Sequence, residues 1–488
     1  MTKLVAELAE KWEPNQDGSV WTVHLRNGLK WSDGQPLTTK DVYFQYKVLL
    51  SKEMLGAAGT ALKDIAGAQD YFDGKAKEIS GIKVIDDTTV EFHLTSPSGL
   101  FPQSLVAPLE FAEHFFSKFS MQEIAGGQML RQPRPCSGPF QWSKYVQDQY
   151  IEATANPNYW RKDAKGRKLP YLDAVHYLPI PIVASRLSAL QSGSLDLMHT
   201  DDDPTIIQIR GLSPAQYQFV EDDKITVGEP DMNFSMLNTT LAPLNDIRIR
   251  QAMAYAFNQA DYLKVICRNV AQPTDGLFPP GNPYHDPSGT GYPTFNAAKA
   301  SALVSSWMHD NGGAAPLINY STTPTPESQN AADLIQGYLT NVGFKVTIAT
   351  VQQAAFIDDA VLGQFHVFGW RQFANVDPDL NYIFWSATSA VSHNGIVTNF
   401  ARNKDPKIQA ACDQGRQSAD PAVRKKAYQT VNKMLAKDLP YIWGDRDVWN
   451  VCATSTTQNF NHPTDPQHRL GLGMLSGIIW PTEIWKTA

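Results

Sequence analysis

The sequence is short of cysteine, of long apolar runs and of clustered basic residues, and each shortage argues against a class of protein. Its 488 residues include four cysteines, Cys136, Cys267, Cys412 and Cys452. None forms a C-x-x-C pair or lies at metal-ligand spacing with histidine, which argues against a structural zinc site. They could form two disulfides, one disulfide, or remain four buried thiols. No apolar run approaches the roughly 18 residues of a membrane-spanning helix.

The signatures of common enzymes are also missing. The sequence contains no G-x-S-x-G elbow, no H-E-x-x-H pair and no G-x-x-x-x-G-K-[ST] phosphate loop, and its 11 histidines are scattered. A formal net charge of −7 without a basic cluster makes nucleic acid and anionic membranes poor partners. We therefore expect no catalytic residues, no metal site, no cofactor and no nucleic-acid partner.

What the sequence does contain is typical of a large soluble protein. Hydrophobic residues make up 42% and charged residues 19% of the chain, and aromatic residues reach 11%. The length allows a substantial core and suggests about three domains. The aromatic content fits either large cores or a ligand cleft lined with flat rings.

The stretch from Trp21 to Tyr46 predicts a strand, two turns and a helix in that order. Trp21, Val23 and Leu25 alternate with polar residues, which is the period of a strand with one buried face. Asn27-Gly28 and Asp33-Gly34 both tolerate positive φ and predict turns. Thr38 then predicts a helix N-cap, with Asp41 in the capping-box position.

Helices and short strands alternate through the rest of the chain, which predicts an α/β fold. Residues 82–94 form a hairpin pattern, and a strand is predicted from Asn233. Apolar residues from Ile249 to Leu263 lie at the spacing of one helical face. Residues 327–350 predict a helix followed by a strand, and residues 365–370 another apolar strand.

Five passages, in one fixed order, resemble the extracytoplasmic solute-binding proteins of peptide/nickel-type ABC transporters, family 5, which include the oligopeptide- and dipeptide-binding proteins. The five, running from Leu8 to Trp443, are LAEKWEPNQDGSVWTVHLR; SGPFQWSKY with NPNYWRKD and LPYLDAV; LNTTLAPLNDIRIRQAMAYAFNQ; FHVFGWRQFANVDPDLN; and ADPAVRKKAYQTVNKMLAKDLPYIW. The similarity runs from about Leu4 to the C-terminus.

The resemblance implies a type II periplasmic-binding-protein-like fold, with two lobes that close on a ligand and an extra α/β domain. We expect the extra domain over residues 1–133, lobe I over 134–230, lobe II over 231–460, and a return to lobe I over 461–488. The resemblance also implies a monomer, located in the periplasm or attached to the cell surface. It would bind a peptide or another small molecule and deliver it to the membrane subunits of an ABC permease.

The same resemblance suggests where the ligand lies. In relatives that bind peptides, the bend after the apolar strand carries an Asp that pairs with the amino terminus of the peptide. Here the bend is one residue longer and Phe373 or a neighbour takes that place, while Asp377 follows later. The candidate ligand-binding residues are Met232, Asn233, Phe234, Trp370, Arg371, Gln372, Phe373, Asp377, Trp385 and Asn399.

Three alternatives stay open at this point. The missing Asp and the abundant aromatic residues favour an oligosaccharide as the second choice of ligand. A glycoside hydrolase that uses Asp377 or Asp379 with a second carboxylate is a rival from another class. For these two aspartates, a turn followed by a helix N-cap is the plainer interpretation. A regulatory ligand sensor ranks last.

The amino terminus, MTKLVAELAEKWEP, has no apolar core of a signal peptide and no lipoprotein-type cysteine. Members of the family usually carry an exported leader and a first strand–helix segment, whereas this sequence starts close to Leu8. We therefore expect the N-terminal segment to be missing from this reading frame.

Overall fold

The segment from Val20 to Leu49 folds as its pattern predicts in the computed structural model, which describes residues 4–54, 62, 64–105, 109–222, 229–391, 397–461, 464–468 and 476–487. Strand β2 (Val20–Leu25) buries alternate residues, and Gly28 and Gly34 adopt positive φ of 72° and 89°. Thr38 caps α1 (Thr39–Leu49), and the Thr38 amide donates to Asp41 Oδ2 at 2.8 Å. The strand, both turns and the capping box are confirmed.

The chain divides into two units, which we describe separately. Unit 1 contains Asp201–Arg210 and Glu221–Trp449, and unit 2 contains Lys3–Thr200, Gly211–Val220 and Asn450–Ala488. The chain therefore changes unit after residues 200, 210, 220 and 449. The finer division predicted at residues 133, 230 and 460 stays a prediction.

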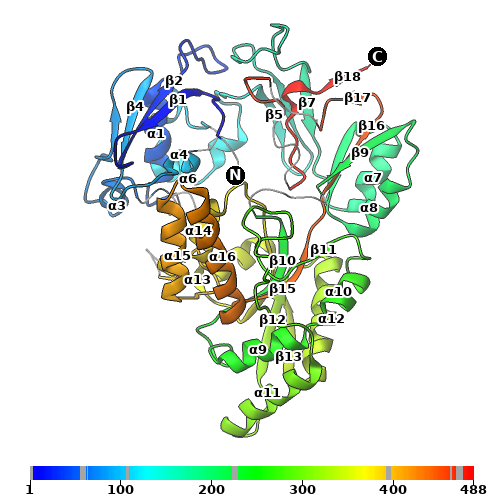
Figure 1. Cartoon of the computed structure of the whole chain (residues 1–488). Helices are drawn as coiled ribbons and strands as arrows, with labels where there is room; N and C mark the ends of the chain where they lie inside the picture. Colours follow the sequence, from blue (N-terminus) through cyan, green and yellow to red (C-terminus); the bar gives the residue numbers. More distant parts are fainter. Residues whose placement is uncertain are drawn as a thin grey trace. The chain divides into compact units, whose positions relative to one another are not determined.

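Unit 2 begins with an antiparallel sheet in the order β1-β2-β4-β3 (Figure 1). The predicted hairpin of residues 82–94 provides its last two strands. Trp21, Val90 and Phe92 pack with Tyr46 of α1 in the core of this sheet. Its further elements are β1 (Ala9–Pro14), β3 (Ile82–Val84), β4 (Thr89–His93), α3 (Ala68–Phe72), α4 (Phe101–Ser104), α5 (Glu113–Phe116), α6 (Met121–Ala125) and the 3-10 helix η1 (Gln128–Arg131).

Three small sheets complete unit 2, in the orders β5-β6-β7, β8-β16-β9 and β17-β18. The elements are β5 (Phe140–Val146), β6 (Tyr150–Ala155), β7 (Ala174–Tyr177), α7 (Val183–Gln191), β8 (Leu197–Thr200), β9 (Tyr217–Glu221, whose last residue belongs to unit 1), β16 (Asn450–Thr454), β17 (Thr457–Gln458), η4 (Pro481–Glu483) and β18 (Trp485–Lys486).

Unit 1 is organised by a six-stranded mixed sheet in the order β11-β15-β10-β14-β12-β13. Strand β10 lies between β14 and β15 and is antiparallel to both, whereas β12 is parallel to β13 and β14. The strands are β10 (Met232–Leu237), β11 (Gln272–Pro273), β12 (Leu317–Thr322), β13 (Lys345–Thr350), β14 (Val367–Gln372) and β15 (Tyr441–Arg446). The strands expected near residues 233, 344–348 and 365–370 are confirmed.

Helices cover both faces of this sheet. Successive residues of a strand point to opposite faces, so neighbouring residues pack against different helices. Leu237 and Ile442 pack against one helical group, and Met236 and Trp443 pack against the other. Figure 1 labels the helices of both groups. The first group is α9 (Ile247–Ala256), α10 (Gln259–Val265), α11 (Ala297–Asp310) and α12 (Pro326–Asn341). The second is α13 (Gln353–Leu362), α14 (Tyr382–Trp385), α15 (Pro406–Gln417) and α16 (Pro421–Asp438), with η2 (Pro378–Asn381) and η3 (Thr388–Ala390) between them.

The apolar stripe from Ile249 to Leu263 forms two helices rather than one. Helix α9 ends at Ala256, and Asn258 caps α10 through a hydrogen bond from the Asp261 amide to Asn258 Oδ1 at 3.3 Å. Most of the stripe is buried as expected, but Ala260 in the new first turn is exposed. The asparagine is the physical cause, since its side chain favours a cap over a helix interior.

Helix α8 (Asp203–Arg210) joins unit 1 from a separate part of the chain. Its Ile206 packs with Val270 and Val448, and all three are nearly fully buried. Among the described helices, none is long and apolar enough to cross a membrane. All four cysteines are free thiols, three of them buried and Cys136 partly exposed, which decides among the alternatives that the sequence leaves open.

Candidate ligand-binding site

The register of the central strands brings Asn233 between two residues of opposite charge. Asn233 of β10 is paired with Arg371 of β14 on one side and with Asp445 of β15 on the other. Paired residues on neighbouring strands share a face of the sheet. The Asn233 amide nitrogen donates to Asp445 Oδ2 at 3.1 Å and to Asp447 Oδ1 at 2.7 Å. Asn233 therefore holds two carboxyl groups close together.

Arg371 lies beside Asn233 in the sheet register, near the end of β14, and contacts two aspartates. It forms an ion pair with Asp201, and its Nη1 lies 3.4 Å from Asp447 Oδ2. The guanidinium carbon lies 5.7 Å from the Phe373 ring centre and 5.5 Å from that of Trp449, within the range of cation–π attraction. Desolvation opposes the charge of Arg371, but the charges of Asp447 and Asp201 dominate and raise its pKa.

Five acidic residues in this region interact electrostatically with one another, and we call them the carboxyl cluster: Asp201, Asp203, Glu327, Asp445 and Asp447. Burial, with the neighbouring negative charges, raises the pKa of Asp203 to about 8. Burial also raises the pKa of Asp445 to about 6, although Asn233 and Arg371 act against it. The pKa of Asp447 is raised well above its usual range by burial, with Asp445 and Asp201 adding to the effect. Limited hydration and the charges of Asp201 and Asp202 raise the pKa of Glu327 to about 7.

The other face of the same strands is apolar. Met232 and Phe234 are buried in the core beneath α13 to α16. Trp370 is partly buried against the same core and stacks on Phe356, with ring centres 5.6 Å apart. Met232, Phe234 and Trp370 therefore all pack in this core, and among the three Trp370 keeps some exposed surface.

The end of β14 and the bend that follows it hold one buried and one exposed candidate. Gln372 is 7% exposed and donates to Asn381 Oδ1 at 3.3 Å. Phe373 follows with 59% of its surface exposed. An apolar ring this exposed has little packing to lose, so Phe373 is free to contact a ligand.

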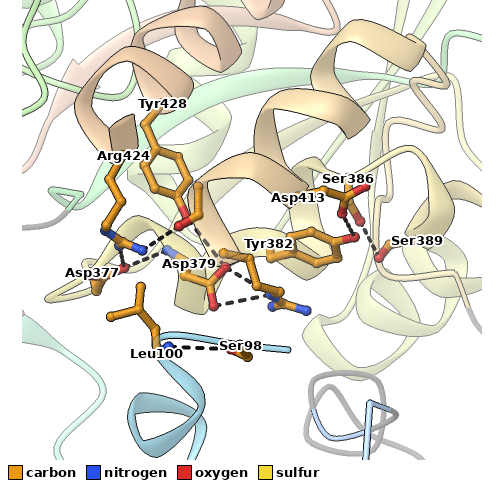
Figure 2. Close-up of polar contacts among 12 residues, drawn as sticks. Ser98, Leu100, Asp377, Asp379, Tyr382, Ser386, Ser389, Asp413, Arg424 and Tyr428 are labelled. Carbon is orange, nitrogen blue, oxygen red and sulfur yellow. Dashed lines mark hydrogen bonds and ion pairs between the residues drawn. The ribbon is translucent and has the colours of Figure 1, made fainter. Parts of the chain in front are cut away.

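Asp377 and Asp379 each have an arginine partner. Arg424 Nη2 donates to Asp377 Oδ1 at 2.6 Å (Figure 2), and Arg416 Nε donates to Asp379 Oδ1 at 3.0 Å. Asp377 also caps η2 by accepting from the Asp379 amide at 2.9 Å, which confirms the plainer interpretation of a turn and cap. The pairing with arginine gives both carboxylates a structural role and does not favour the rival glycosidase.

Trp385 and Asn399 belong to a polar network in the core. Trp385 is 2% exposed, and its Nε1 donates to Glu229 Oε1 at 3.1 Å. Asn399 is buried and donates to the Ser386 carbonyl at 3.0 Å. Glu229 is fully buried, and this burial raises its pKa to about 8.

The structure thus brings together Asn233, Arg371 and Phe373 and places the other candidates in the surrounding core. Their contact with a ligand stays a prediction. Sequence reasoning did not single out Asp445 and Asp447, whose signal is a D-x-D pair directly after the apolar run YIWG. Within the described residues, no group of three or more His, Cys, Asp or Glu has an arrangement that would hold a metal ion.

Comparison with known proteins gives a consistent result. The dipeptide-binding protein of Escherichia coli (strain K12) is 26% identical over 456 residues, which cover 90% of this chain and 80% of that protein. Lactococcal OppA, in complex with an endogenous peptide in its closed conformation, superposes with a TM-score of 0.79 at 18% identity, covering 96% of this chain and 91% of that one. NikZ from Campylobacter jejuni, in complex with Ni(L-His), gives a TM-score of 0.74 at 17% identity, covering 93% and 86%.

The two structural matches confirm the predicted fold class. Residues 3–394 match the profile of the bacterial extracellular solute-binding proteins, family 5 Middle, which is most of the chain. The chain belongs to the bacterial extracellular solute-binding proteins of family 5.

Proposed function

We propose that this chain captures a peptide and delivers it to the membrane subunits of an ABC importer. One observation carries the proposal: a dipeptide-binding protein is 26% identical to this chain over 90% of its length. Relatives of the same fold also hold other solutes, such as the nickel–histidine complex in NikZ, so the fold alone does not fix the ligand. The sequence match favours a peptide.

The proposed activity is binding without chemical change. A solute receptor of this kind needs a ligand that binds one conformation better than another, since only differential affinity shifts a population. The most prominent carboxylates of the hydrolase alternative, Asp377 and Asp379, are already held by Arg424 and Arg416. This supports a receptor and gives no support to turnover.

Asn233, Arg371 and Phe373 are the residues that we expect to contact the peptide. The Asn233 amide nitrogen already donates to Asp445 and Asp447, so Asn233 can offer its side-chain oxygen as an acceptor to a peptide N–H group. A guanidinium pairs with carboxylate groups. Phe373 offers an aromatic ring, and 59% of the residue's surface is exposed. Asn233 and Arg371 are paired in the sheet register, so a ligand that reaches one lies near the other.

We further propose that the chain works outside the cytoplasmic membrane, as the family description states for its members, and as a monomer. Sedimentation equilibrium would test the second point, with 54.2 kDa expected for one chain.

Calorimetry with defined panels tests the ligand class. The panels are di- to nonapeptides, neutral oligosaccharides and nickel–histidine. We expect heat from peptides only, and a rise in melting temperature with them, because a ligand at 100 times its Kd stabilises the native state by about 2.7 kcal/mol. Heat from sugars alone, or hydrolysis of chromogenic glycosides, would remove the peptide proposal.

A matched pair of aromatic substitutions tests the site. Phe373→Ala removes an exposed ring at the candidate site, and Phe295→Ala removes one that is 50% exposed elsewhere in unit 1. Neither ring contributes much packing, so both variants should fold. We expect Phe373→Ala to weaken peptide binding about tenfold, equivalent to about 1.4 kcal/mol, and Phe295→Ala to leave it unchanged. Equal affinities for both variants would show that the peptide binds elsewhere.

A further inference from the structure

Asn381 connects both ends of the bend that carries Phe373. Asn381 is fully buried, and its Oδ1 accepts hydrogen bonds from Gln372 Nε2 at 3.3 Å and from Asn375 Nδ2 at 2.6 Å. Gln372 is the last residue of β14, and Asn375 lies three positions later. One oxygen atom therefore holds the residues on either side of Phe373 and Ala374 and closes the bend.

The backbone of the bend is held by the segment that precedes β10. The Asn375 amide donates to the Glu229 carbonyl at 2.9 Å, and the Glu229 amide donates to the Asn375 carbonyl at 2.7 Å. The Ala374 amide donates to Asp231 Oδ1 at 2.8 Å. Phe373 is 59% exposed, so its ring projects from a bend whose next two residues are fixed by hydrogen bonds.

The nitrogen of the Asn381 amide binds the same segment. Asn381 Nδ2 donates to Glu229 Oε2, and Trp385 Nε1 donates to Glu229 Oε1 at 3.1 Å. Glu229 is also fully buried. Asn381 therefore links the side chains of Gln372 and Asn375 to a buried carboxyl group. A buried polar network whose members are hydrogen-bonded favours one arrangement of its side chains over others.

The helix that follows Asn381 does not account for this buried amide. Asn381 is the N-cap residue of α14, a position where an asparagine oxygen commonly accepts from a backbone amide of the helix. Asn258 does so for α10. The Asn381 side chain makes no such bond to the described backbone of α14, and its oxygen binds the bend instead.

We propose that Asn381 is a positioning residue for ligand binding, because it fixes the bend that presents Arg371 and Phe373 to the peptide. This inference rests on the proposed function. Arg371 and Phe373 lie on either side of Gln372, and the Arg371 guanidinium carbon is 5.7 Å from the Phe373 ring centre. A bend that is ordered before the ligand arrives loses less conformational entropy on binding.

Two buried asparagines of unit 1 provide a matched experiment. Asn381→Ala removes the amide at the bend, and Asn432→Ala removes a buried amide elsewhere, whose Oδ1 accepts from the Leu277 amide at 2.9 Å. Both variants leave buried groups without partners, so both should lower the melting temperature. By calorimetry with the peptides that bind the wild type, we expect Asn381→Ala to weaken binding about tenfold. Asn432→Ala should leave the affinity within about twofold of the wild type.

A milder substitution covers the case in which Asn381→Ala does not fold. Asn375→Ala removes one donor to Asn381 from a partly exposed side chain and keeps the backbone bonds to Glu229. We expect it to weaken peptide binding about threefold.

A double substitution tests whether Asn381 acts through the exposed ring. Asn381→Ala should weaken binding by a smaller factor in the Phe373→Ala background than in the wild type, because the ring that it positions is then absent. A role in general stability would give the same factor in both backgrounds.

Hydrogen exchange measures the order of the bend in the free protein. The amides of Ala374 and Asn375 are both hydrogen-bonded, to Asp231 and Glu229. We expect their exchange to become about tenfold faster in Asn381→Ala. Exchange at these two amides should stay as in the wild type in Asn432→Ala.

The outcomes separate this inference from the proposed function. If Asn381→Ala and Asn375→Ala bind peptides as tightly as the wild type, the inference falls and the peptide receptor stands. An equal loss of affinity in Asn381→Ala and Asn432→Ala, or an unreduced factor in the Phe373→Ala background, would also overturn it. If the wild-type protein itself binds no peptide of the panels, the proposed function fails, and the positioning role fails with it.

Discussion

Two regions of unit 1 bury several carboxyl groups and treat their charge in opposite ways. Around η2, Arg424 pairs with Asp377 (Figure 2) and Arg416 pairs with Asp379, one cation for each anion. At the end of β15, Arg371 is shared by Asp201 and Asp447, and Asp445 Oδ1 has no hydrogen-bond donor among the residues that the structure describes. The first arrangement fixes the position of helices α15 and α16 with respect to η2. The second places one guanidinium beside several carboxyl groups.

Both arrangements remove charged groups from water, which is unfavourable, so the two regions can be compared by how each one compensates the charge. A buried ion pair gains little net stability, but removing one partner leaves a charge that the interior cannot solvate. Carboxyl groups that share one cation repel one another, and this repulsion lowers the stability of the folded chain. Three substitutions test this comparison.

The largest effect is expected from Arg424→Met. Arg424 is fully buried, and its loss leaves Asp377, 3% exposed, without its cation. We expect a loss of about 3–5 kcal/mol in the free energy of unfolding, measured by urea denaturation. The exposed neighbour Lys425→Met should change it by less than about 0.5 kcal/mol. Similar small changes in both variants would show that the pair at η2 does not stabilise the fold.

Glu229→Gln isolates a buried carboxyl group that has neutral donors only. Burial raises the pKa of Glu229 to about 8, so the native state holds its proton more tightly than the unfolded chain does. Its contribution to stability is complete below the unfolded pKa near 4.5 and is lost as the pH rises through about 8. The wild type should lose stability on the order of 3 kcal/mol from this group between pH 5 and pH 9.

The neutral glutamine should remove most of that slope. Melting curves across the pH range measure it, and the exposed Glu10→Gln should leave the slope as in the wild type. An unchanged slope in Glu229→Gln would place the titrating group elsewhere.

Asp447→Asn should have the smallest effect and the opposite sign. The pKa of Asp447 is raised in the folded chain, so its ionisation lowers stability as the pH rises. Removing the charge keeps the acceptor for Asn233 and should stabilise the free protein by about 1 kcal/mol at pH 8, and less at pH 5. Asp333→Asn removes an exposed charge on α12 and serves as the control for net charge. A destabilised Asp447→Asn variant would mean that the cluster is balanced after all.

Local signals in the sequence predicted much of the fold. The period-two burial of Trp21, Val23 and Leu25 and the Thr38 capping box depend on neighbouring residues only, and both are confirmed. The break between α9 and α10 was missed because Asn258 caps a helix inside an apolar stripe that continues across it. The assignment of α8 to unit 1 depends on Ile206 meeting Val270 and Val448, contacts that no local pattern reveals.

The sequence predicted the candidate site only in part. Resemblance pointed to Asn233 and Arg371, and the sheet register places them side by side. Asp445 was missed because its importance comes from its pairing with Asn233 across β10 and β15, more than 200 positions away in sequence. The arginine partners of Asp377 and Asp379 come from α15 and α16, so sequence alone could not show that these carboxylates are neutralised.

The detached position of α8 has a consequence for any attempt to dissect the molecule. Because the chain leaves unit 1 after Arg210 and re-enters it at Glu221, a fragment made of Glu221–Trp449 would lack Ile206. Val270 and Val448 would then face water, and two members of the carboxyl cluster, Asp201 and Asp203, would be absent from the fragment that keeps Arg371. A fragment of unit 1 should therefore fold only if residues 201–210, which contain α8, are joined to residues 221–449.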